Sequence, residues 1–206
     1  MLRDERSIHG ALAVIINSAG QAGWVLGGSS GLMLRGLALD IPPRDIDLYC
    51  DDQEAEAIHR SLSGYATDEP VISETDIYRS RLSHYSIGGV SVELVGGFQV
   101  AASGCFYKVE VKKVLIPYGE QMAIQACDGQ DGLRMRVVPL AHELWFNALR
   151  GREDRVELVA GAMAHDPASH AEALAAIEQG NEFSLEMKES VHRRLKHLKE
   201  GVRIGR

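Results

Sequence analysis

Residues 24–36 read WVLGGSSGLMLRG, an apolar run that is stopped by two glycines and two serines and followed by a leucine-rich segment. The apolar run predicts a short buried strand, and the leucines predict a helix that Ser29 or Ser30 can cap. A strand, a glycine turn and a helix start together form a place for an anion, because glycine lets backbone N–H groups approach a phosphate. Close packing of strand on helix would explain the glycines as readily.

Two better-known phosphate motifs do not fit this turn. A P-loop needs Lys followed by Ser or Thr after its second glycine, and neither follows here. The dinucleotide pattern GxGxxG is also absent, because residues 27–32 read GGSSGL.

A second feature follows the prolines at 42 and 43, where residues 45–50 read DIDLYC. In a strand, alternate residues point to the same face, so Asp45 and Asp47 project together while Ile46 and Leu48 face the core. Two carboxylates on one face repel each other, and a divalent cation removes that repulsion. Oxygen ligands suit Mg²⁺ or Mn²⁺ better than zinc. For this motif alone, a turn and a cap after the prolines are the alternative.

A third carboxylate, Glu93, lies in VSVELV between Val92 and Leu94. Alternation places Glu93 on the face opposite these apolar neighbours. If this strand pairs beside the first acidic strand, three carboxylates converge near the glycine turn. Two metal ions about 3.5–4 Å apart, held by such a trio, clamp a phosphorus centre for in-line attack.

These elements resemble the nucleotidyltransferases of the DNA polymerase β-like superfamily. The resemblance rests on LGGSS at 26–30, a helix at 31–37, RDIDLY at 44–49 and VELV at 92–95. The chain is most similar to the small bacterial branch that includes antibiotic nucleotidyltransferases and abortive-infection nucleotidyltransferase toxins. Residues 137–160 also resemble that branch, and the similarity covers roughly residues 20–160.

The resemblance implies a role for each matching residue. Gly28, Ser29 and Ser30 would bind phosphates of a nucleoside triphosphate, together with Arg44 beside the first acid. Asp45, Asp47 and Glu93 would hold Mg²⁺ or Mn²⁺ and act in catalysis. The third acid of the family is often Asp, and Glu is one methylene longer.

The C-terminal part departs further from the family pattern. Where the family often presents a lysine near the phosphates, this chain offers Asn147, with Arg150 and Arg152 nearby. An amide cannot neutralise phosphate charge, so an arginine would have to substitute. These departures motivate an alternative, a catalytically degenerate nucleotide- or partner-binding module on the same fold.

The whole pattern predicts an α/β (α+β) fold, with a mixed-sheet nucleotidyltransferase core at 1–138 and a helical region at 139–206. Helices are expected at 4–19 and 53–63, and in four segments after Pro139. A hairpin is expected at 77–95 around Gly88-Gly89. Further strands are expected at 106–116 and 132–138.

Composition narrows the functional classes. The net charge of −7 argues against a protein that coats nucleic acid, although residues 188–206 carry seven Lys or Arg and two Glu. Three scattered cysteines fit neither a disulfide framework nor a zinc site. No apolar run approaches the ~20 residues of a membrane helix, and no signal peptide is evident, so a cytoplasmic protein is expected.

Two histidines are given minor roles. His84, with Arg79 and Arg81, is interpreted as a surface strand residue, although it could face the acceptor or the nucleotide. His142-Glu143 would suggest a zinc protease only if a second histidine stood at position 146, which is Phe146. We therefore expect His142-Glu143 to be a pair on a helix surface.

The expected reaction is the transfer of a nucleoside monophosphate from a nucleoside triphosphate to an acceptor hydroxyl, with release of pyrophosphate. The acceptor stays open between a small molecule such as an antibiotic, a protein side chain and a tRNA end. The oligomeric state also stays open.

Overall fold

The computed structural model describes residues 3–20, 23–124 and 132–204. By its contacts the chain forms two compact units, one of Met1–Phe98 and Val109–Val138, the other of Gln99–Lys108 and Pro139–Arg206. The sequence prediction and the structure both place a boundary after residue 138. Residues 99–108, which the sequence prediction assigned to the core, group with the C-terminal helices in the structure. No helix in the described part of the chain is long and apolar enough to span a membrane.

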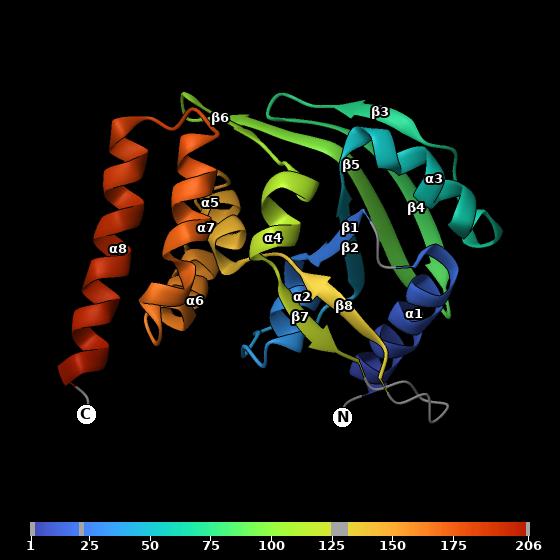
Figure 1. Cartoon of the computed structure of the whole chain (residues 1–206), viewed down its shortest axis with the longest axis horizontal. Coiled ribbons are helices and arrows are strands. Elements are labelled where there is room, and N and C mark those ends of the chain that lie inside the picture. Colours follow the sequence, from blue (N-terminus) through green and yellow to red (C-terminus); the bar gives the residue numbers. More distant parts are fainter. Residues whose placement is uncertain (1–2, 21–22, 125–131, 205–206) are drawn as a thin grey trace. The chain divides into compact units, whose positions relative to one another are not determined.

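A mixed eight-stranded sheet is the framework of the chain, as the sequence predicts (Figure 1). Its strands are ordered β3-β4-β5-β2-β1-β8-β7, with β6 paired to β5. The β1–β8 and β2–β5 pairs are parallel, whereas β1–β2, β3–β4, β5–β6 and β7–β8 are antiparallel. The strands are β1 (Trp24–Gly27), β2 (Asp45–Cys50), β3 (Val71–Glu74), β4 (Tyr78–Ile87), β5 (Val90–Ala102), β6 (Cys105–Lys108), β7 (Glu120–Ala123) and β8 (Arg134–Val137).

The first unit has helices α1 (Arg3–Ala19), α2 (Gly28–Leu34) and α3 (Asp52–Leu62). Helices α1 and α3 lie on one side of the sheet (Figure 1), and their apolar side chains form a core with that face of the sheet. From α1 these include Leu12 and Ile15, and from the sheet Ile46 and Leu48, each 0% exposed. The alternation in the sequence therefore identifies correctly which strand residues face inward.

The segment at 106–116 corrects a prediction. Only its start is strand, because β6 ends at Lys108 and a π-helical turn follows at Val111–Leu115, leading into α4 (Ile116–Tyr118). The Asp51 carboxylate accepts hydrogen bonds from the backbone N–H groups of Val111 (2.8 Å) and Lys112 (3.0 Å). A partner 60 residues away thus holds the helical turn, and local pattern does not reveal it. The short strands β3 and β7 were also not predicted.

The second unit has the four predicted helices, α5 (Leu140–Leu149), α6 (Glu153–Met163), α7 (Pro167–Gln179) and α8 (Leu185–Ile204). Helix α5 packs on α6, α7 and α8, and the β5–β6 hairpin joins them. Phe106 and Glu182 exchange two backbone hydrogen bonds of 2.7 and 3.0 Å, and the Trp145 ring stacks on Phe183 at 4.0 Å between centroids.

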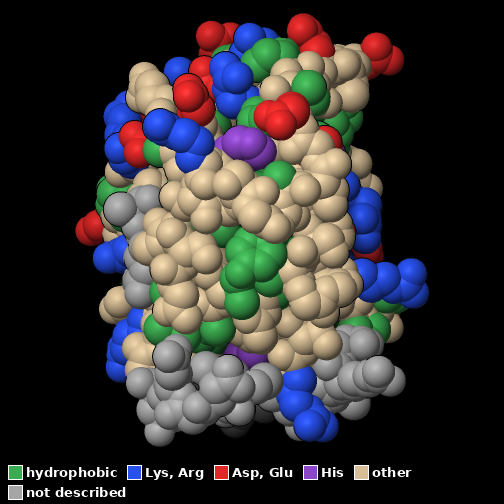
Figure 2. Space-filling view, turned by 90° about the vertical axis from the view of Figure 1, so that its right-hand side faces the viewer, with side chains coloured by type: hydrophobic (Ala, Val, Ile, Leu, Met, Phe, Trp, Pro, Cys, Tyr) green, Lys and Arg blue, Asp and Glu red, His purple; other side chains and the backbone are tan. Residues whose placement is uncertain are grey.

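In the face drawn in Figure 2, acidic and basic side chains gather together at the top, basic side chains also lie along both edges, and the middle shows few charges. Cys50 and Cys105 are free and buried, and Cys127 lies outside the described residues.

Candidate active site

A row of residues crosses three neighbouring strands of the first unit. Gly27 on β1 lies opposite Asp47 on β2, and Asp47 lies opposite Glu93 on β5. Neighbouring strands are about 4.8 Å apart, so the row brings the glycine turn and two carboxylates together. The expectation that the two acidic strands pair is confirmed.

The acids share the face of the sheet that turns away from the α1–α3 core. Val92 and Leu94, on either side of Glu93, are buried in that core. On the other face Asp45 is exposed, Asp47 is partly exposed, and the Glu93 side chain is 38% exposed. The buried neighbours therefore hold the strands in the core, while solvent or a ligand can reach the carboxylates.

Gly28, the first residue of α2, lies directly against the Asp47 carboxylate. Its φ of +62° is left-handed, and a Cβ at this position would lie 1.9 Å from Asp47 Oδ2. A side chain would therefore be strained by the backbone and would also displace the acid. The glycine turn and the first acidic strand form one local structure.

The two serines of the turn differ in their surroundings. Ser30 is 1% exposed, and its hydroxyl donates a hydrogen bond of 2.5 Å to the backbone carbonyl of Asp45. This bond fixes α2 to the start of β2. Ser29 is partly exposed. Neither serine caps the helix, because its N-cap is Gly27 and makes no side-chain capping bond; the predicted serine cap is wrong.

His84 extends the row by one strand. A two-residue turn pairs Ile87 with Val90, and counting back along both strands brings His84 opposite Glu93. Its Nε2 lies 4.0 Å from Glu93 Oε1, and its Nδ1 lies 2.5 Å from Asp68 Oδ2. The backbone N–H of His84 also donates to Asp68, and this bond lowers the pKa of that carboxyl.

Sequence reasoning gave His84 only a minor part. The Gly88-Gly89 turn could have placed His84 opposite Glu93, because a two-residue hairpin loop fixes which residues of its two strands face each other. The contribution of Asp68 could not be found in this way, since it comes from the loop before β3.

The chemistry of this donor set suits a divalent cation. Three carboxylates on one face supply hard oxygen ligands of the kind that Mg²⁺ and Mn²⁺ take in proteins. Within residues 3–20, 23–124 and 132–204, no three Asp, Glu, His or Cys side chains are gathered as they stand into a metal-binding group. The backbone therefore places the three carboxylates on one face, and holding an ion would require their side chains to turn toward it.

Comparisons with known proteins connect this arrangement to a fold. No protein-family model matches the chain, and no curated protein matches it. Among solved structures, a protein from Thermotoga maritima described as a nucleotidyltransferase aligns with a TM-score of 0.57 and 22% identity, over 76% of this chain and 91% of that one. The chain has the nucleotidyltransferase fold.

Two antibiotic-related structures align more weakly on the nucleotidyltransferase fold. ANT(2'')-Ia in complex with adenylyl-2''-tobramycin has a TM-score of 0.49 and 14% identity, over 86% of this chain and 98% of that one. The lincosamide antibiotic adenylyltransferase LnuA, bound to lincomycin, has a TM-score of 0.37 and 12% identity, over 66% and 84%. Neither adds to the fold assignment.

The remaining predicted nucleotide-binding residues have different surroundings. Asn147 is 5% exposed, and its amide donates to the backbone oxygen and to Oε2 of Glu143, at 2.8 and 3.2 Å. It is an interior residue of the second unit, which does not favour a phosphate contact. Arg150 lies over the Phe146 ring at 4.7 Å, and Arg152 pairs with Asp154 at 2.9 Å. Arg44 is exposed beside Asp45.

The pair His142-Glu143 is not on the surface. His142 is 0% and Glu143 2% exposed, so the expected surface position is wrong. His142 Nδ1 lies 2.7 Å from the Tyr107 hydroxyl, which β6 supplies. Helix α5 is buried on nearly all sides because α6, α7 and α8 pack around it. The local sequence does not reveal these neighbours.

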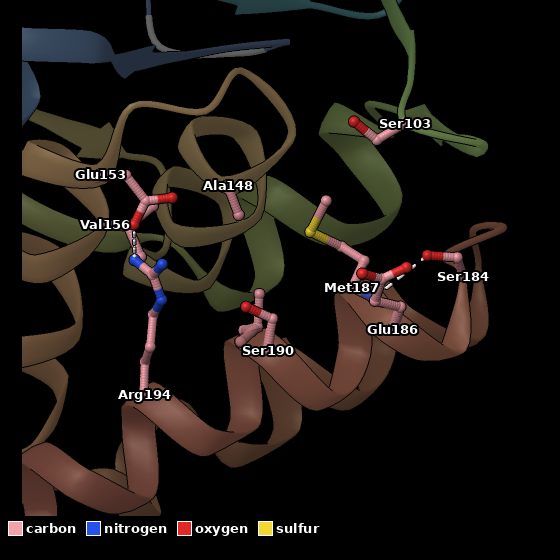
Figure 3. Close-up of a pocket in the computed structure, with 10 residues that line it drawn as sticks. Ser103, Ala148, Glu153, Val156, Ser184, Glu186, Met187, Ser190 and Arg194 are labelled. Carbon is pink, nitrogen blue, oxygen red and sulfur yellow. Dashed lines mark hydrogen bonds and ion pairs between the residues drawn. The ribbon is translucent and has the colours of Figure 1, made fainter.

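A separate pocket of about 260 Å³ lies within the second unit. Figure 3 shows Glu153 and Arg194 paired at one side, with Ser190 and Met187 projecting from α8. Its ten lining residues differ from the predicted site residues. Its lining comes from α5, α6 and α8, with Ser103 from the turn between β5 and β6 and Ser184 from the residue before α8.

Proposed function

We propose that this chain is a metal-dependent nucleotidyltransferase, which moves a nucleoside monophosphate from a nucleoside triphosphate to an acceptor hydroxyl and releases pyrophosphate. The observation that carries the proposal is the direct pairing of Asp47 with Glu93 beside the Gly27-Gly28 turn, on the exposed face of the sheet. The nucleotidyltransferase fold of the chain supports the same reaction class.

In this reaction the acceptor oxygen attacks the α-phosphorus, the bond from that phosphorus to the bridging oxygen breaks, and pyrophosphate leaves. Mg²⁺ or Mn²⁺, when bound, would neutralise triphosphate charge and activate the attacking hydroxyl. Asp45 and Asp47 would hold the ion, and Glu93 would complete the ligand set and accept the hydroxyl proton. Ser29 would donate to a phosphate oxygen.

Gly28 and Ser30 have supporting parts in this proposal. Gly28 lets the helix start lie against Asp47, which keeps the phosphate-binding turn next to the metal-binding acid. Ser30 fixes the same turn to Asp45 through its buried hydrogen bond. The phosphate and metal subsites would therefore move together.

The nucleotide part can be tested by thermal unfolding with each of the four nucleoside triphosphates, with and without Mg²⁺. A ligand at ~100 times its Kd stabilises the fold by about 2.7 kcal/mol. We expect such a stabilisation with Mg²⁺ and at least one triphosphate. Asp47→Asn should abolish it, whereas Asp40→Asn, an exposed acid before β2, should leave it unchanged.

Pyrophosphate release then separates transfer from binding. Antibiotics with free hydroxyls, hydroxyl-bearing proteins and tRNA are the acceptor classes to test. Binding of the triphosphate without pyrophosphate release from any of them would favour the degenerate binding module, which the interior position of Asn147 also motivates. Absence of stabilisation in the wild type with every triphosphate would contradict the proposed function.

A further inference from the structure

His84 is held by Asp68 at two points. Asp68 Oδ2 lies 2.5 Å from His84 Nδ1, and Asp68 Oδ1 accepts a 2.7 Å hydrogen bond from the His84 backbone N–H. The adjacent Thr67 N–H donates to the His84 carbonyl at 2.9 Å. The imidazole therefore has a fixed position, and the Nδ1 contact directs the other ring nitrogen, Nε2, away from Asp68.

That second nitrogen faces the proposed active site. Its distance of 4.0 Å to Glu93 Oε1 is too long for a hydrogen bond. Metal–nitrogen and metal–oxygen bonds are each about 2.0–2.2 Å, so two ligands of one ion lie between about 3 and 4 Å apart. The gap between Nε2 and Oε1 fits an ion that binds both atoms.

Asp68 completes an arrangement that is common around protein-bound metals. A metal-binding histidine usually donates its other ring N–H to a carboxylate, which fixes the tautomer and the direction of the free nitrogen. Asp68 is placed to do this for His84, and the side chains of His84 and Glu93 are 33% and 38% exposed, so an ion can reach them.

We propose that His84 and Glu93 bind a first-row transition-metal ion in preference to Mg²⁺, with Asp68 orienting the imidazole. The pair supplies two ligands, and Asp47, directly across from Glu93, is the next available donor. An imidazole nitrogen favours transition metals, because Mg²⁺ takes oxygen ligands. This inference rests on the proposed function for its link to the nucleotide, but metal binding can be measured without nucleotide.

The probe is Mn²⁺, added to tag-free full-length protein without nucleotide. Electron paramagnetic resonance gives the bound fraction, and its pulsed form detects coupling to a ligand nitrogen. We expect tighter binding of Mn²⁺ than of Mg²⁺ and a nitrogen coupling from His84. His84→Ala should remove the coupling and weaken Mn²⁺ binding at least about tenfold, and Asp68→Asn should weaken it by roughly tenfold or more with His84 intact.

His192→Ala is the matched control. His192 pairs with Glu178 at 2.9 Å but is exposed on α8, far along the chain from the proposed site, and its loss should change neither signal. Thermal unfolding of each variant without metal identifies any variant that fails to fold. If His84→Ala fails to fold, Asp68→Asn still tests the metal site.

The outcomes separate the two proposals. Mn²⁺ binding without nitrogen coupling, unchanged affinity in His84→Ala, or no Mn²⁺ binding at millimolar concentration would each overturn the metal site. If Mg²⁺ and a triphosphate still stabilise the wild type and not Asp47→Asn, the proposed function survives that result. Nitrogen-coupled Mn²⁺ without any triphosphate binding would keep the metal site and overturn the nucleotidyltransferase.

Discussion

Gly28 and Asp47 show how closely single residues define this site. The glycine leaves just enough room for the Asp47 carboxylate, because a Cβ would lie 1.9 Å from its Oδ2. The constraint joins two features that are 19 positions apart in sequence. Both were recognised from the sequence, but their contact was not.

Gly28→Ala tests this constraint, and Gly36→Ala is its matched control. Both glycines have a positive φ, +62° and +76°, but a Cβ on Gly36 would meet nothing within 4 Å. Each change should lower the free energy of unfolding by about 1–2 kcal/mol through the backbone alone. Only Gly28→Ala should also displace Asp47 and abolish the stabilisation by Mg²⁺ and a nucleoside triphosphate. Equal nucleotide binding by both variants would contradict this reading.

At the same scale, strand alternation correctly predicted the face of the sheet on which the acids lie. Alternation places Asp45 and Asp47 on one face of β2 and Glu93 on the face of β5 opposite its buried neighbours, and the β2–β5 register then brings Asp47 and Glu93 side by side. Asp68 and Asn147 could not be assigned in this way. The position of Asp68 depends on how a loop returns to β4, and the burial of Asn147 depends on which elements surround α5.

At the scale of elements, a single carboxylate determines where the chain turns helical after β6. The sequence at 106–116 has apolar residues at a spacing that suits a strand, and strand was predicted. Asp51 instead binds the N–H groups of Val111 and Lys112, which removes them from a sheet ladder. Elements with a local signal were predicted correctly, α1 from its apolar spacing, α3 from its composition and the β4–β5 hairpin from its glycine turn.

Asp51→Ala should therefore destabilise the first unit more than Asp52→Ala. Loss of Asp51 leaves two backbone N–H groups without their acceptor, at a cost of about 1–3 kcal/mol in the free energy of unfolding. Asp52 forms an exposed ion pair with Arg81 at 2.9 Å, which is worth less than about 1 kcal/mol. Denaturant unfolding of the two neighbouring variants measures the difference, and equal losses would argue against the role of Asp51.

At the scale of the whole molecule, the second unit contains a buried histidine that makes its stability depend on pH. Burial lowers the pKa of His142, in the second unit, to about 3 from an ordinary 6.5. The unfolded chain takes up this proton near its ordinary pKa, whereas the folded unit does not, so acid favours unfolding. Stability from this residue is complete above its ordinary pKa and is lost as the pH falls toward the folded pKa.

The two tryptophans allow each unit to be followed by itself. Trp24 is in the first unit and Trp145 in the second, and both are buried. With Trp24→Phe, the remaining Trp145 should report a stability that falls by up to about 1.4 kcal/mol per pH unit below the ordinary histidine pKa. Adding His142→Gln should flatten that slope. An unchanged slope would show that other groups cause the acid sensitivity.

The discontinuous second unit limits how this chain can be recombined. Its residues come from 99–108 as well as from 139 onward, so the chain passes between the units three times. A recombination breakpoint at residue 138 would exchange the four helices but leave behind Tyr107, the partner of His142, and Phe106, the partner of Glu182. Chimeras of this protein that exchange the four helices therefore need to carry residues 99–108 as well, which takes three crossovers rather than one.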